Sequence, residues 1–153
     1  MRVGLFYLVL CLASPVVTSA AEDPFNGKWK VDESRSKLPA NAPRTQALRL
    51  EVDEKQLQID YQGVDGNGRP AEWKIRADFG GNLSGVLGTP EMDAVRCWRS
   101  DERTILVKMS RGAETIGWET LEVAKNGKTL KLTHAVTDAK GKETKSVSTF
   151  EKQ

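Results

Sequence analysis

The chain has 153 residues, of which 39% are hydrophobic and 29% charged, and its basic and acidic side chains leave a net charge of +2. These values are typical of one globular domain, and a chain with so nearly balanced a charge is not expected to bind nucleic acid. One histidine and two cysteines cannot supply the three or four ligands of a Cys/His zinc site, so neither a metal nor a cofactor is expected.

The first twenty residues have the pattern of a secretory signal peptide. Arg2 gives a positive start, an apolar run extends over residues 3–13, and small residues lead up to Ala20 and Ala21. The run is shorter than the roughly 20 residues of a transmembrane helix, although an N-terminal membrane anchor is the alternative interpretation. We expect a signal peptide over residues 1–20, cleaved after Ala20 or Ala21, and an exported domain over residues 21–153, periplasmic or secreted, without a membrane span.

Cys97 is the one cysteine that remains once residues 1–20 are removed. An exported domain with a single thiol has no internal disulfide, so its core must hold the fold unaided. A domain of about 130 residues buries roughly two-thirds of its unfolded surface, which is enough for this. We interpret Cys97 as a small buried strand residue and assign it no chemistry.

Short runs of alternating apolar and polar residues fill the rest of the chain. Residues 72–79 show the pattern well, because Trp, Ile, Ala and Phe alternate with four charged residues, as in a strand with one face in the core. Turn-forming clusters such as 65–68 and 126–127 separate the runs. Ten strands are predicted, near residues 27–32, 45–52, 56–64, 71–79, 83–87, 94–99, 104–110, 115–124, 129–137 and 144–151.

The segment from Glu33 to Arg44 is the one long connection in this pattern. Its first half, residues 33–38, is expected to make one short helical turn that ends before Pro39. Pro39 and Pro43 would stiffen the remainder into an extended arm, which a partner protein can bind in a cleft.

A sheet of about ten short strands must close or fold over itself to cover its edges. A barrel and a sandwich both achieve this, and tight turns between consecutive strands favour the barrel. We therefore predict an all-β fold, an antiparallel up-and-down β-barrel of about 8–10 strands.

The two ends of the predicted domain resemble the lipocalin and fatty-acid-binding protein superfamily. The start, Phe25 to Val31, contains an aromatic residue followed by Gly27-x-Trp29, and the stretches 126–134 and 149–152 are similar to the last two strands of the fatty-acid-binding branch. Residues 29–37 also resemble the start of small exported bacterial lipocalin-like proteins. The resemblance implies a lipocalin-like barrel in which Gly27 and Trp29 are structural, with Trp29 closing one end.

The sequence departs from the fatty-acid-binding branch at the positions that hold a fatty acid. Ser148 and Phe150 stand where that branch has the Arg and Tyr of its carboxylate clamp. The segment 33–44 is also too short for the helix pair that covers the cavity in that branch. An uncovered barrel mouth or a filled barrel is therefore expected.

Aromatic and polar residues on different predicted strands are the candidate ligand contacts. Large aromatic side chains from four strands are expected to converge in the barrel interior, where they line a pocket or fill a solid core. His134 shares a strand face with Leu130 and Leu132, so we expect it to point inward, as a ligand contact or as a buried hydrogen-bonded histidine. The predicted ligand-binding residues are Tyr61, Trp73, Trp98, Trp118, His134 and Ser148.

The same residues argue against catalysis. A nucleophilic site would have to be built around His134, the only imidazole, and the chain has no Gly-x-Ser-x-Gly motif. We predict no catalytic residue and no enzyme. The leading hypothesis is an exported, monomeric binding protein that carries or sequesters a small hydrophobic or weakly polar molecule. The alternative is a barrel without a cavity that binds a protein partner or inhibits an enzyme.

Overall fold

The computed structural model describes residues 22–38, 44–65, 67–88, 92–137 and 140–153. The expected signal peptide, Pro39 and Pro43 lie outside these residues. Ten strands are present: β1 Gly27–Lys37, β2 Arg44–Val52, β3 Gln56–Val64, β4 Pro70–Asp78, β5 Ser84–Leu87, β6 Ala94–Asp101, β7 Thr104–Arg111, β8 Glu114–Val123, β9 Thr129–Thr137 and β10 Glu143–Lys152. The predicted strands match them within a few residues, except that β1 extends further.

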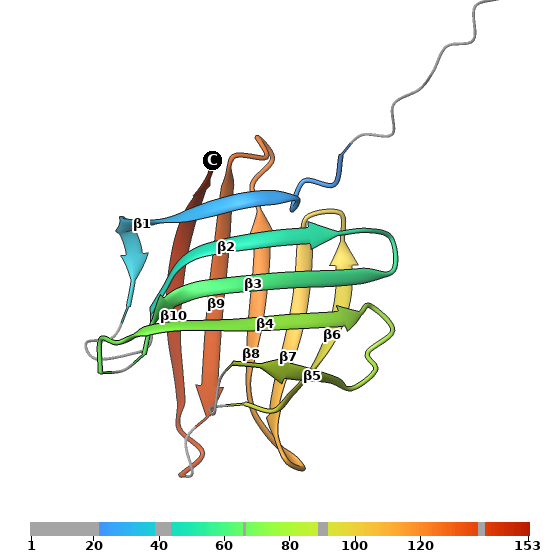
Figure 1. The fold of residues 1–153 in the computed structure, drawn as a ribbon, viewed down its shortest axis with the longest axis vertical. Helices are drawn as coiled ribbons and strands as arrows, with labels where there is room; N and C mark the ends of the chain where they lie inside the picture. Colours follow the sequence, from blue (N-terminus) through green and yellow to red (C-terminus); the bar gives the residue numbers. More distant parts are fainter. Residues whose placement is uncertain (1–21, 39–43, 66, 89–91, 138–139) are drawn as a thin grey trace, which may run out of the picture.

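The ten strands form one closed barrel. Each strand pairs antiparallel with the next in the chain, and β1 pairs with β10 to close the sheet. Strands β2, β3 and β4 cross in front of β6 to β10 at a steep angle (Figure 1). The prediction of an all-β, antiparallel up-and-down barrel is confirmed, and the described residues contain no helix. None of them forms a helix long and apolar enough to cross a membrane.

The core lies inside the barrel and follows from the two-residue period of the strands. In β3, for instance, Leu57, Ile59 and Tyr61 are buried, whereas the residues between them are not. Every strand except the short β5 contributes at least one buried side chain of this kind. The largest fully buried side chains are Trp29, Tyr61, Phe25, Phe150, Leu50, Leu57, Ile59, Ile75, Ile105, Met109, Leu121 and Leu130.

Trp29 closes the end of the barrel at which the chain enters β1. Its side chain is 1% exposed, its indole Nε1 donates a hydrogen bond to the Phe25 carbonyl at 2.9 Å, and Lys152 Nζ lies 5.3 Å from the ring centroid. Gly27 turns the chain into this position with φ 129°, and a Cβ there would lie 3.0 Å from the Lys152 side chain. Both features suit a glycine, which has no side chain to place.

The predicted helical turn at residues 33–38 is wrong, because β1 continues to Lys37. The Asp32 carboxylate accepts hydrogen bonds from the backbone N–H groups of Ser34 and Arg35, a local turn that competes with a helix. The strand bends there, and Lys37 then pairs with Val147 of β10. The proposed long arm is therefore shorter than expected, since its first residues belong to the barrel wall.

Candidate ligand-binding site

A buried acid, Glu119, lies at the centre of the candidate site. It belongs to the inner face of β8, between the buried Gly117 and Leu121, and is 4% exposed. Tyr61 Oη donates a hydrogen bond to one carboxylate oxygen at 2.7 Å. His134 Nδ1 lies 3.0 Å from the other oxygen, because β8 and β9 place Glu119 directly opposite His134. Both oxygens thus have a partner, as a buried carboxylate requires.

Tyr61 reaches Glu119 from the far wall of the barrel. It pairs with Trp73 across β3 and β4, and the two rings stack with centroids 4.9 Å apart. Burial, followed by the negative charge of Glu119, raises the pKa of the Tyr61 hydroxyl well above its ordinary value. The hydroxyl therefore keeps its proton and remains a hydrogen-bond donor.

Trp73 presents an unused hydrogen-bond donor. Its Nε1 atom is buried and has no partner among the described residues, although the side chain as a whole is only half-buried. A buried N–H group without an acceptor costs on the order of 1 to 3 kcal/mol. A bound molecule with an acceptor, or a water, would remove this cost.

These side chains lie near the end of the barrel opposite Trp29, which we call the mouth. Tyr61, Trp73 and His134 are each three residues from the end of their strand that borders the turns β3–β4 and β9–β10, roughly 10 Å at the rise of a strand. Trp73 and His134 are partly exposed at this level, whereas Glu119 and Tyr61 are buried. The opposite end is the one that Trp29 fills.

The two serines of β10 complete the inner face of this half. Ser146 lies opposite His134 and Ser148 lies opposite Leu132, and Ser148 is buried. Four of the six predicted ligand-binding residues, namely Tyr61, Trp73, His134 and Ser148, therefore belong to the interior. Whether they contact a ligand stays a prediction.

The expectation that Trp98 and Trp118 also point into the barrel is wrong. Trp118 is 42% exposed, and it stacks on Trp98 with ring centroids 5.8 Å apart. Their strand neighbours Cys97 and Glu119 take the inner positions, so the alternation of the strands turns both indoles outward. The interior loses two of its expected aromatic side chains.

Glu119 and Ser146 are site residues that the sequence pattern did not predict. Glu119 shares one face of β8 with the buried Leu121 and Val123, and this alternation is the sequence signal that places it inside. The prediction that Trp118 points inward excludes Glu119 from the interior, because adjacent strand residues face opposite sides. Ser146 is two residues from Ser148 in β10, and residues two apart in a strand face the same side, so the predicted inward position of Ser148 also implies that of Ser146.

Cys97 is buried, as its place in a predicted strand indicates. Burial, followed by the charges of Glu119 and Asp78, raises the pKa of its thiol to about 12. The thiol is therefore protonated at neutral pH and takes no part in nucleophilic chemistry.

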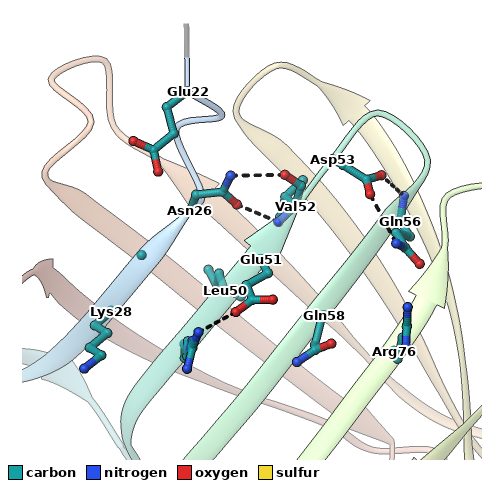
Figure 2. A pocket seen from close by; sticks show the side chains of 12 residues that line it. Glu22, Asn26, Lys28, Leu50, Glu51, Val52, Asp53, Gln56, Gln58 and Arg76 are labelled. Atoms are coloured by element: carbon teal, nitrogen blue, oxygen red, sulfur yellow. Dashed lines mark hydrogen bonds and ion pairs between the residues drawn. The ribbon is translucent and has the colours of Figure 1, made fainter. Parts of the chain in front are cut away.

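A separate groove of about 620 Å³ lies on the outer face of β1 to β4. Figure 2 shows its polar wall, with Asn26 bonded to the Val52 backbone and Gln58 and Arg76 on the neighbouring strands. An ion pair of 2.7 Å joins Arg49 to Glu51 in the same wall. The groove lies outside the barrel and toward the end that Trp29 fills, so it does not connect with Glu119.

No group of three or more His, Cys, Asp or Glu side chains in the described ranges is placed to hold a metal ion. No family model and no curated protein matches the chain. Among solved structures, the chain is similar to a redesigned β-barrel, with 16% sequence identity and a TM-score of 0.45 over 85% of this chain and 92% of that chain.

Proposed function

We propose that the protein is an exported, lipocalin-like binding protein, periplasmic or secreted and monomeric, that carries or sequesters a small molecule in the open half of its barrel. The fold is compatible with binding a small ligand, since a closed barrel of this kind can hold one in its mouth. The observation that carries the proposal is the buried Glu119 with its two partners, set in a largely apolar interior beside the unpaired Nε1 of Trp73.

The ligand is hydrophobic or weakly polar and carries no negative charge. Among the described residues, the side chains that pack on the core around Glu119, Tyr61 and His134 are hydrophobic or uncharged, namely Val31, Trp73, Val86, Ile116, Val136 and Ser146, without a lysine or arginine. A fatty acid would place its carboxylate near that of Glu119, and like charges in a low-dielectric interior repel strongly. A neutral acceptor such as an ester or ketone suits the donor of Trp73.

Binding is tested by fluorescence titration with a set of hydrophobic esters and ketones, after mass spectrometry of any ligand that survives purification. Trp73→Phe removes the indole nearest the proposed ligand, and Trp118→Phe, on the outer face, is the matched control. We expect saturable quenching in the parent protein and in Trp118→Phe, and its loss in Trp73→Phe. The absence of a saturable response to every compound would contradict the proposal.

The charge preference is tested by competition between a fatty acid and its methyl ester at pH 8. We expect the ester to bind at least tenfold more tightly, which corresponds to about 1.4 kcal/mol. Glu119→Gln removes the carboxylate, so the difference in affinity between the ester and the free acid should become smaller. Tighter binding of the free acid to the parent protein would show that the interior holds a cation near the ligand.

We further propose that the protein is not an enzyme, although β8, β9 and β10 align Glu119, His134 and Ser146 in one row. An acyl-transfer site also needs hydrogen-bond donors that stabilise the oxyanion, usually the largest contribution to the rate. Along this part of β10, the backbone N–H groups that face β9 are used by the ladder. We expect hydrolysis of p-nitrophenyl acetate to be unchanged by Ser146→Ala, and a loss of tenfold or more would make Ser146 a nucleophile.

A further inference from the structure

Three large hydrophobic side chains are exposed in the described part of the chain, and all three lie on one side of the barrel. Leu83 is 59% exposed, Leu87 is 71% exposed and Trp118 is 42% exposed. Leu83 precedes β5, Leu87 ends it, and Trp118 lies on β8, with β6 and β7 between β5 and β8. The register places Leu83 level with Arg96, Lys108 and Trp118, about 14 Å from Trp118 at three strand spacings. Leu87 lies four residues further along and forms the edge of the patch.

Trp98 lies between the Trp118 side of this patch and the chain segment that leads to Leu83. It stacks on Trp118 across the intervening strand β7, with centroids 5.8 Å apart. Its ring also lies against Gly81, where an added Cβ would come within 2.4 Å of the indole Nε1. The indole pair is thus held against the barrel wall by packing.

The patch is also positively charged. Arg96 and Lys108 lie opposite each other on β6 and β7, with Arg96 Nη1 donating to the Gly81 carbonyl at 2.7 Å and Lys108 Nζ 5.7 Å from the Trp118 ring centroid. The segments 83–87, 94–98 and 106–110 contain no Asp or Glu. The nearest acids are engaged elsewhere: Glu119 is buried in the barrel, Glu122 pairs with Lys131, and Asp78 accepts hydrogen bonds from Gly80 and Asn82. We name the outer face made by Leu83, Leu87, Arg96, Trp98, Lys108 and Trp118 the indole face.

We propose that the indole face docks the protein on a membrane surface that contains anionic lipids. Tryptophan side chains settle at the level of the lipid headgroups, leucines enter the acyl boundary, and arginine and lysine attract anionic headgroups. A second copy of the chain is a poor partner, because a symmetric contact would set Arg96 and Lys108 against the same cations. This docking is independent of any ligand inside the barrel.

The test measures flotation with vesicles of phosphatidylglycerol and phosphatidylcholine, using a chain that begins at Ala21 and retains all ten strands. Lys108→Glu changes the charge of the indole face, and Lys30→Glu changes the net charge equally on the exposed side of β1. Trp118→Gln and Leu87→Gln remove apolar contacts. Circular dichroism melting first establishes that all four variants fold.

We expect the parent protein to float with phosphatidylglycerol vesicles and not with pure phosphatidylcholine. Lys108→Glu and Trp118→Gln should each weaken the partition at least tenfold, Leu87→Gln at least threefold, and Lys30→Glu less than threefold. Brominated lipids should quench the parent protein more than Trp118→Phe. The proposal is overturned if the parent protein does not float, or if Lys108→Glu and Lys30→Glu weaken the partition equally. It is also overturned if the protein binds no vesicles but forms a dimer that Trp118→Gln dissociates.

Discussion

Glu119 is a buried acid whose two carboxylate oxygens both have hydrogen-bond partners, so its replacement should change the stability of the fold. Replacing it with leucine leaves the Tyr61 hydroxyl without its acceptor in the interior, at a cost of about 1 to 3 kcal/mol. We expect the free energy of unfolding in urea to fall by that amount in Glu119→Leu, and by less in Glu119→Gln, which keeps an acceptor. Glu122→Gln, on the outer face of β8, is the control and should change it by less than about 0.5 kcal/mol. Equal stability of Glu119→Leu and the parent protein would mean that water replaces the carboxylate.

Cys97 gives the fold a predictable sensitivity to alkaline pH. Because the pKa of its thiol is about 12 in the folded state and 9.0 in the unfolded chain, its contribution is fully present below pH 9 and is lost as the pH rises toward 12. The slope of the unfolding free energy for this one group approaches about 1.4 kcal/mol per pH unit. Cys97→Ala should show a shallower fall between pH 9 and 11, with Tyr61 accounting for part of the remainder. A thiol reagent that labels native Cys97 as fast as unfolded Cys97 would contradict its burial.

At the scale of elements, the bend of β1 depends on Asp32. Hydrogen bonds from Ser34 and Arg35 lower the pKa of this carboxyl from 3.8 to about 2, so the bend is stabilised above pH 4 and loses that contribution as the pH falls toward 2. In Asp32→Ala we expect faster hydrogen exchange in residues 34–37, and unchanged exchange in the core strands β7 and β8. If exchange were unchanged in residues 34–37 as well, the pairing of Lys37 with Val147 would hold the bend without Asp32.

Strand positions followed from the sequence because turn residues and a two-residue period mark them, but two local features did not. The bend at Asp32 comes from side-chain contacts to the backbone, which leave no hydrophobic pattern. In β8 the register shifts between Thr115 and Gly117, so Ile116 packs against the core although Trp118, two residues later, lies on the outer face. When the alternation changes within a strand, the sequence does not show which residues face the core. The sequence pattern therefore predicts that Trp118 faces inward, which leaves its neighbour Glu119 out of the predicted site.

At the scale of the whole molecule, the interior divides into two halves with different roles. One half is filled by Trp29, Phe25 and Phe150, all fully buried, and it provides stability. The other half contains Glu119 and its partners, and its half-buried Trp73 and His134 border the mouth. A closed barrel permits this division, because the hydrogen-bonded wall is continuous and packing at one end supports the other end.

Trp29→Ala tests this division directly. Trp29 joins the segment before β1, through the Phe25 carbonyl, to the last residue of β10, through Lys152, at the pair of strands that closes the barrel. Truncating a buried aromatic of this size costs roughly 3 to 5 kcal/mol, and because closure involves the whole sheet, we expect a single lowered unfolding transition in urea. Trp118→Ala, on the outer face, should cost less than about 1 kcal/mol. A loss below about 1 kcal/mol in Trp29→Ala, or an early transition confined to β1 and β10, would mean that the filled half does not support the barrel as one unit.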